Sequence, residues 1–318
     1  MSYALTCEIE IGKYIFKNVT ECRIESSRKT LGDRATITLP HKFHNDYLSK
    51  VIKAKDTVVI RLGYNGNLTT EFTGYVSEVQ PGRPVVISCE DEIYNLKRSK
   101  PAAKSFESIK LESLLKYMVP GIQTECPDIT LSPFYVKSGV TTAKALEQLK
   151  DVYGLDIYFR NGKLFAGLAY SEQAIVNLPA INYDLDLNVL PESSLTFKTA
   201  DSVRLKVKAI SVLPNNTTIE TEVGDDDGSS TTLHFYNVQT KEELKRQATE
   251  KLKSMKFDGF SGSMTTLDIP FAQHTMIVNL RDQRDGNSRT GRYFIDTVVT
   301  TFGQGGFRRE LTLGRRAG

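Results

Sequence analysis

A run of β-strand patterns that begins near residue 54 returns, degenerate but in the same order, after residue 272. Ala54–Leu62 aligns without gaps on Ala272–Leu280, with Ala, Thr and Leu at the same offsets. In both copies a glycine-containing turn, a strand with Gly and Tyr, a second tight turn and a last short strand follow. Short strands joined by short turns are typical of a β-meander, so the sequence predicts two related β-domains. Two unrelated meanders are the alternative, because Thr, Val and Gly are common in β-proteins.

The later strands of the two copies also align. Phe72–Val79 matches Gly291–Val298, and Val85–Cys89 matches Arg309–Leu313. Side chains alternate between the two faces of a strand, so matched positions in a shared register are expected on matched faces. We therefore predict one equivalent face in the two copies, and candidate subunit contacts, at Thr57, Val59, Arg61, Thr275, Ile277 and Asn279.

Length and composition restrict the class of protein. A chain of 318 residues exceeds one ordinary core, so two or three domains are expected. Charged residues make up 25% and hydrophobic residues 40%, as in soluble globular proteins. The net charge of +3 favours neither a nucleic-acid-coating nor a membrane-binding surface. With no apolar run of membrane-spanning length and no signal peptide pattern, we expect synthesis in the cytoplasm and no membrane insertion by this chain.

The sequence offers little for catalysis or cofactor binding. The four cysteines form no CxxC pair, and the close pair His41 and His44 has no cysteine nearby, so free thiols and no metal site are expected. Gly259–Ser263 falls one residue short of a nucleophile elbow, and no P-loop, GxGxxG or HExxH motif occurs. A glycosidase-like carboxylate pair is defined only in space and stays open. We expect a structural protein, not an enzyme, with no cofactor.

The patterns along the chain predict four segments. Period-two alternation in residues 1–100 predicts a first β-barrel domain. Helical patterns and an Asn-Gly hairpin turn in 101–170 predict an inserted α+β subdomain. Residues 171–200 form a connector that could return a strand to the first barrel. Residues 201–318 are expected to form the second barrel, with a helix near 240–256 that a capping box opens. The expected fold class is mainly β (α+β), with two related tube-like β-barrels.

One predicted strand near residue 205 carries cations on its polar face, at Arg204, Lys206 and Lys208. A solvated face is the default interpretation, and a surface that contacts a partner is the alternative. A nucleic-acid-binding β-barrel that uses these cations is a competing hypothesis, although the net charge counts against it. The aspartate-rich loop Gly224–Gly228 lacks the ligand spacing of an EF-hand.

The order of elements resembles the baseplate hub proteins of contractile phage tails. These are also called the late control gene D family and are related to the N-terminal half of type VI secretion spike proteins. The resemblance extends over nearly the whole chain and rests on diffuse patterns. The segments that carry it are Thr36–Leu39 before Pro40, Asp56–Leu62, Phe72–Val76, Cys89–Asp91, Leu146–Ile157, Gly291–Ile295 and Arg309–Gly314.

The resemblance implies a homotrimer in which each subunit contributes two barrels. Three such chains present six quasi-equivalent positions, which suits a sixfold tail tube on one side and a threefold spike on the other. The implied partners are the chain itself, the tail tube protein, the spike protein, other baseplate proteins and the tape-measure protein, with DNA only as passing cargo. The implied location is the tail baseplate of the virion, after assembly in the cytoplasm of the bacterial host.

A separate spike polypeptide is expected, because related spike proteins continue into further domains and this chain ends at Gly318. The hypothesis is that the basic C-terminal residues grip that spike, with a disordered solvated tail as the alternative. A tail-associated cell-wall hydrolase is the alternative function from another class. The candidate spike contacts are Arg308, Arg309, Arg315 and Arg316.

Overall fold

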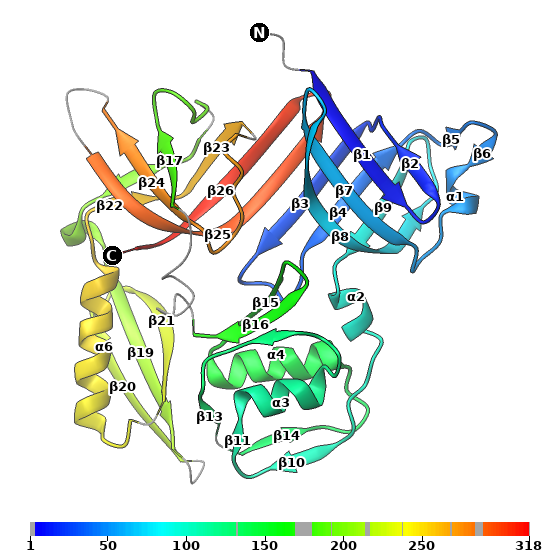
Figure 1. Ribbon diagram of the computed structural model, residues 1–318. Helices are drawn as coiled ribbons and strands as arrows, with labels where there is room; N and C mark the ends of the chain where they lie inside the picture. Colours follow the sequence, from blue (N-terminus) through cyan, green and yellow to red (C-terminus); the bar gives the residue numbers. More distant parts are fainter. Residues whose placement is uncertain are drawn as a thin grey trace.

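Strands dominate the fold, and most of them belong to a single sheet of twelve strands (Figure 1). The mainly β fold class predicted from the sequence is therefore confirmed. The computed structural model describes residues 4–131, 133–168, 180–191, 193–213, 217–236, 238–267, 269–283 and 289–317.

The order of strands in the large sheet is β17-β24-β25-β3-β4-β9-β8-β7-β1-β2, and β26 and β23 branch from β25. The strands from the first part of the chain are β1 (Leu5–Ile11), β2 (Tyr14–Phe16), β3 (Glu21–Ser27), β4 (Arg34–Leu39), β7 (Thr57–Tyr64), β8 (Asn67–Gln80) and β9 (Val85–Glu90). The strands from the last part are β17 (Ala180–Asp184), β23 (Ser263–Leu267), β24 (Ile277–Asp282), β25 (Arg289–Gly303) and β26 (Gly306–Arg316).

Strand β25 joins the two halves of the sheet. Its early residues pair with β24, whereas its later residues pair with β3 on one side and β26 on the other. The fifteen residues of β25 are enough to serve both halves, so the halves share one sheet. Among the described strands, backbone pairing closes no separate barrel in either half. The expectation of two distinct barrels did not anticipate this shared strand.

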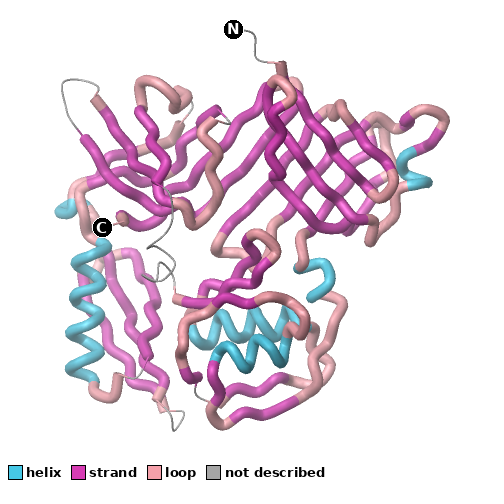
Figure 2. Tube along the Cα trace, viewed as in Figure 1, coloured by secondary structure: helices cyan, strands magenta, loops and turns pink. Residues whose placement is uncertain are grey.

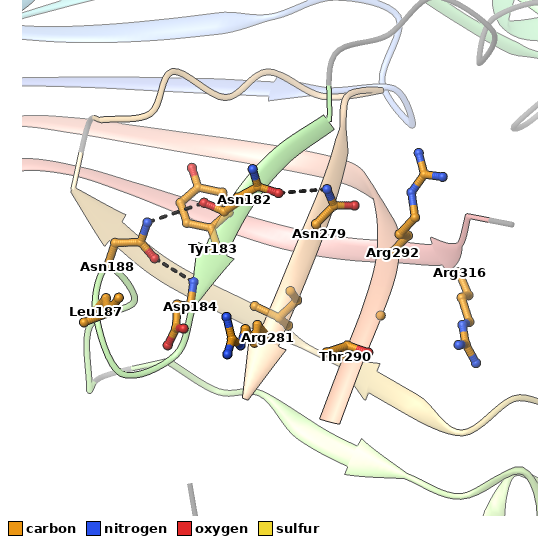
Figure 3. A pocket seen from close by; sticks show the side chains of 12 residues that line it. Asn182, Tyr183, Asp184, Leu187, Asn188, Asn279, Arg281, Thr290, Arg292 and Arg316 are labelled. Carbon is orange, nitrogen blue, oxygen red and sulfur yellow. Dashed lines mark hydrogen bonds between the residues drawn. The ribbon is translucent and has the colours of Figure 1, made fainter. Parts of the chain in front are cut away.

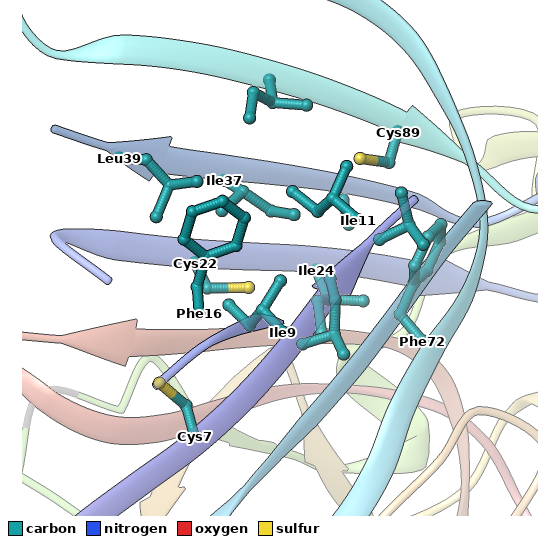
Figure 4. Packing of buried hydrophobic residues seen from close by; sticks show 14 of the residues in the cluster. Cys7, Ile9, Ile11, Phe16, Cys22, Ile24, Ile37, Leu39, Phe72 and Cys89 are labelled. Carbon is teal, nitrogen blue, oxygen red and sulfur yellow. The ribbon is translucent and has the colours of Figure 1, made fainter. Parts of the chain in front are cut away.

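The core of the first half lies between the strands of β1 to β9. Alternate residues of β1, namely Cys7, Ile9 and Ile11, are buried and pack with Phe16 and Phe72 (Figure 4). This is the period-two pattern expected for strands with one buried face. The polar excursion after β4 contains β5 (Lys42–Phe43), β6 (Asp46–Tyr47) and the short helix α1 (Leu48–Val51).

The two segments that repeat in sequence form meanders with the same topology. In the first, β7 pairs antiparallel with β8 and β8 with β9; in the second, β24 pairs with β25 and β25 with β26. Each meander has two irregularities in its pairing, and one of them lies at the same place in both copies. The register shifts between Val76 and Glu78 in β8 and between Ile295 and Thr297 in β25. A β-bulge at matching positions supports a true repeat more strongly than strand order does.

The turn that opens each meander has the same hydrogen bonds. The N–H of Lys55 donates to Val76 O and that of Thr275 donates to Ile295 O, both at 2.8 Å. Lys55 and Thr275 also share a left-handed backbone, with φ of 81° and 71°. Lys55 is therefore the counterpart of Thr275, and two steps further on Thr57 is the counterpart of Ile277.

This equivalence corrects the sequence alignment of the first strand. The alignment set Thr57 on Thr275, which is two residues out of register with the structure. A shift of two residues leaves strand side chains on the same face, but the partner of each residue differs from the predicted one. The true counterparts of Val59 and Arg61 are Asn279 and Arg281. The alignments of the second and third strands agree with the bulge and the pairing.

Two α+β units are inserted between the strands of the large sheet, and both lie below it in Figure 1. The first follows α2 (Ile93–Leu96) and has a hydrophobic cluster of its own. Its helices pack on its short strands. Its elements are β10 (Lys104–Phe106), β11 (Ile109–Lys110), α3 (Leu111–Met118), β12 (Thr124–Glu125), β13 (Thr130–Leu131), β14 (Phe134–Val136), α4 (Thr142–Tyr153), β15 (Asp156–Arg160) and β16 (Lys163–Gly167).

The second unit consists of β19 (Leu205–Val212), β20 (Thr218–Gly224), β21 (Ser229–Tyr236) and α6 (Lys241–Met255) (Figure 2). The helix begins at the predicted capping box, where Thr240 accepts a hydrogen bond from the N–H of Glu243. Instead of packing on the large sheet, α6 shares a separate hydrophobic cluster with β19 and its neighbours. The unit lies between β18 (Thr196–Lys198) and β22 (Gly259–Ser261), which pair with each other.

The connector joins the second half of the sheet. Residues 171–179, which belong to the predicted connector, lie outside the described residues. The strand that follows, β17, pairs in parallel with β24 and not with a strand of the first half. Its buried residues Ile181 and Tyr183 pack in the hydrophobic core of the second half. Burial of these apolar side chains explains why β17 pairs with that half.

Candidate assembly surfaces

The outer face of β7 carries the first three predicted contact residues. Thr57 is exposed, and Val59 and Arg61 are half-buried. Arg61 donates to Glu8 Oε1 at 3.0 Å and also to Glu10, so both carboxylates of β1 hold it. This face is polar and its arginine is already paired within the chain.

The predicted contact residues of the second copy are less accessible to solvent than those of the first. Thr275 is 8% exposed and its hydroxyl accepts a hydrogen bond from Arg160 Nη1 at 2.6 Å. Ile277 is 1% exposed and packs with Phe294 and Ala317. Asn279 alone of the three reaches the outer face, where its amide donates to Asn182 Oδ1 at 2.8 Å. The predicted face is therefore polar in the first copy and partly covered in the second.

Lys206 and Lys208 of β19, and Arg204 just before it, all have carboxylate partners. Lys208 lies 2.8 Å from Glu220 and Lys206 lies 3.1 Å from Glu222, both on β20. Arg204 approaches the aspartates of the loop that follows β20, at 3.6 and 3.4 Å. That loop crosses the start of β19 so closely that a side chain on Gly224 or Gly228 would meet the backbone of Leu205. The acidic loop thus has a structural role and pairs with Arg204, while the glutamates of β20 pair with the two lysines.

The C-terminal arginines differ from one another. Arg309 is 1% exposed and donates to Glu71 of β8 at 2.7 and 2.8 Å, and to the Thr300 hydroxyl at 3.1 Å. It is therefore engaged inside the chain and links β26 to the first half. Arg308 is half-buried, and Arg315 and Arg316 belong to the last strand and not to a disordered tail. Arg316 is exposed and donates to Asp258 O at 3.2 Å.

A buried ion-pair junction joins the first half, the first inserted unit and the second half. Arg28, in the loop after β3, donates to Asp156 of β15 and, at 2.7 Å, to Asp296 of β25. Lys29 lies 2.8 Å from the other oxygen of Asp296. Asp296 occupies the bulge of the second meander, so the bulge turns its carboxylate towards this junction. Sequence reasoning missed these residues, since no spacing pattern links positions so far apart.

A second buried contact, between β3, β4 and the end of β9, involves two aspartates. Asp33 accepts from the Ser26 hydroxyl at 2.7 Å and from the N–H of Ser27 at 3.3 Å. Asp91 accepts from the N–H groups of Asp33 and Ile93, both at 2.9 Å. All four carboxylate oxygens therefore bind turn donors. The pair acts as a structural clamp, although both residues line a hollow of about 390 Å³.

Burial raises the pKa of Asp33 to about 7 and that of Asp91 to about 8, and the Asp33 charge adds to the shift at Asp91. The folded chain then holds protons that the unfolded chain releases above its carboxyl pKa, so stability falls as pH rises towards 8. His274 has the opposite effect below pH 6.5, since burial lowers its pKa to about 4.

We therefore expect a lower free energy of unfolding at pH 8.5 than at pH 6.5, measured by urea titration. The D33N/D91N variant should remove most of that difference, because neither amide titrates. A D128N variant, at an exposed aspartate, is the matched control. The same pH dependence in D33N/D91N as in the unaltered chain would contradict this assignment.

A hollow of about 680 Å³ lies on the outer face of β17, β24 and β25 (Figure 3). Asn182 and Asn279 are hydrogen-bonded across its floor. The guanidinium groups around it come from three positions, Arg281, Arg292 and Arg316. The sequence alignment did not select Arg281, although a shift of two residues would have placed it opposite Arg61.

The described residues contain no group of three or more His, Cys, Asp or Glu side chains placed to hold a metal ion. All four cysteines are free thiols. None of the helices in the described ranges has the length and apolar character to cross a membrane.

No family model matches the sequence, and no curated protein matches it either. Solved structures do match the fold. A tail protein of Neisseria meningitidis is 15% identical with a TM-score of 0.66, over 99% of this chain and 97% of that one. The 43 kDa tail protein of the Shewanella oneidensis prophage MuSo2 is 15% identical with a TM-score of 0.65, over 98% of both chains.

A third match is an Escherichia coli protein described as a component of the type VI secretion system that is structurally similar to the T4 bacteriophage tail proteins gp27 and gp5. It is 9% identical with a TM-score of 0.60, over 97% of this chain and 77% of that one. All three are below 25% identity, so these matches show a shared fold and nothing further. The resemblance predicted from the sequence is confirmed at that level: this chain has the fold of phage tail proteins and of a type VI secretion component over nearly its whole length.

Proposed function

We propose that this protein is a structural hub of the baseplate of a phage tail or a related contractile injection machine. Three copies form a ring in which the two halves of each chain occupy alternating positions. The ring adapts a hexameric tail tube to a trimeric spike and encloses the channel through which DNA passes. Other baseplate proteins and the tape-measure protein are further candidate partners.

The repeated meander is the observation that carries this proposal. The two copies share their opening turn, their strand order and the place of one bulge. A chain with two equivalent modules can offer six similar positions to a sixfold partner from only three copies. The continuous sheet through β25 fixes the two modules relative to each other, as a ring component requires.

We expect the purified protein to have a solution mass of three times the 35.6 kDa chain, measured by light scattering on a sizing column. Isologous dimers would not give six equivalent modules. A strictly monomeric or dimeric particle across the accessible concentration range would contradict the proposal.

Spike binding would use the C-terminal strand. Arg309 is engaged with Glu71, so the contacts proposed for the spike are Arg308, Arg315 and Arg316 of the same strand. No specific feature favours the two other functions. The buried aspartate pair is held by turn donors, which suits a clamp better than a hydrolase. The cations of β19 are neutralised by carboxylates, which weakens the case for nucleic-acid binding.

A further inference from the structure

Because the meander is repeated, the hollow on the second half can be compared with the equivalent surface of the first half. Arg61 and Arg281 are structural counterparts, because each lies six residues after the left-handed residue that opens its meander. Both are on the outer face, and each has a neighbouring strand beside it. β1 flanks β7, and β17 flanks β24. The surroundings of Arg61 therefore show which groups an arginine at this position binds when the neighbouring strand provides them.

Arg61 has two carboxylates. Glu8 lies opposite it in the register of β1 and β7, and Glu10 lies opposite Val59; both bind its guanidinium. An arginine with two carboxylates is well satisfied, since its planar fork of donors matches carboxylate geometry.

Strand β17 does not supply the same pair. Opposite Asn279 it carries Asn182, and opposite Arg281 it carries Asp184. The carboxylate of Asp184 accepts from the N–H of Asp186 at 3.0 Å, within its own turn. In the part of the chain that the structure describes, no carboxylate lies within ion-pair distance of Arg281 or of Arg292.

The rest of the hollow is suited to an extended peptide. Arg292 lies beside Asn279 on β25, and Arg316 lies at the far side. The Asn279 Oδ1 atom is buried and has no hydrogen-bond partner among the described residues, so its capacity to accept a hydrogen bond is unused. Leu187, at the rim, is 83% exposed and offers an apolar contact.

We propose that this hollow binds an acidic segment of another protein chain, whose carboxylates contact Arg281 and Arg292 as Glu8 and Glu10 contact Arg61. A protein segment is favoured over a nucleic acid because the exposed Leu187 fits an apolar side chain. Complementary charge of this kind sets the choice of partner and the rate of encounter. This inference holds whether or not the chain forms a trimeric hub.

The test uses a fluorescent peptide that copies residues 4–12 of this chain with serine in place of Cys7, because this sequence is what satisfies Arg61. The full-length protein is titrated at low salt and anisotropy is measured. We expect the peptide to bind at least fivefold more tightly than the same peptide with both glutamates changed to glutamine. Binding should weaken as salt increases, because the contacts are exposed to solvent.

The R281Q/R292Q variant should bind the acidic peptide at least fivefold more weakly than the unaltered protein. The control R23Q/R246Q removes two arginines that pair with glutamates on their own elements, and it should bind as the unaltered protein does. A smaller loss in R281Q/R292Q, or a glutamine peptide that binds equally well, would overturn the proposal. Tighter binding of an oligothymidylate of equal charge would also overturn it, in favour of a phosphate ligand.

Discussion

Replacing Arg309 with valine should lower the free energy of unfolding by about 3–5 kcal/mol. The change leaves the Glu71 carboxylate buried without its cation, since Arg309 is 1% exposed and Glu71 is 4% exposed at the side chain. An uncompensated buried charge costs far more than the net value of the pair. Urea denaturation at neutral pH measures the loss.

A double variant distinguishes the two possible causes of the lost stability, an unpaired buried charge and altered packing. The counterpart of Arg309 in the first meander is Val85, which is buried, so the fold accepts valine at this position. The E71Q/R309V variant should therefore recover at least half of the lost stability, because no buried charge remains. If the double variant is as unstable as R309V alone, the loss comes from packing and the ion-pair account fails.

Replacing Arg28 with methionine should cost about 3–5 kcal/mol as well, because it leaves the carboxylates of Asp156 and Asp296 buried together. Their side chains are 13% and 5% exposed. Arg28 also joins three parts of the chain, so we expect the first inserted unit to unfold separately in the variant. Two denaturation transitions, followed by far-UV circular dichroism, would replace one.

The matched control for that variant removes the buried charge as well as the arginine. R28M/D156N/D296N should be more stable than R28M, because two neutral amides replace two buried carboxylates that have lost the Arg28 guanidinium. R23M, at an exposed pair, should change stability by less than about 1 kcal/mol. A loss below that size in R28M would contradict the assigned role of the junction.

The repeat could be predicted from sequence, but its register could not. Glycine, tyrosine and apolar residues aligned the second and third strands correctly, and the bulges at Ser77 and Asp296 agree with that alignment. The first strand was misplaced by two residues because identical Ala, Thr and Leu residues outweighed the turn. The turn itself is defined by backbone conformation at Lys55 and Thr275, two residues of different chemistry.

Local signals predicted local structure, and long-range pairing escaped them. The capping box predicted the start of α6 to within one residue. It did not predict that α6 packs on β19, in a hydrophobic cluster separate from the large sheet. The length of β25, which merges the halves, gives no periodic signal beyond that of an ordinary strand. The arginines were visible as charges, but whether Arg309 or Arg316 is exposed depends on partners distant in sequence.

A three-dimensional image of the assembled particle, by cryo-electron microscopy, tests the central claim most directly. We predict a threefold particle in which β7–β9 and β24–β26 alternate at the same distance from the axis, giving six similar modules around one channel. A particle without threefold symmetry, or one in which the two meanders lie at clearly different radii, would contradict the account.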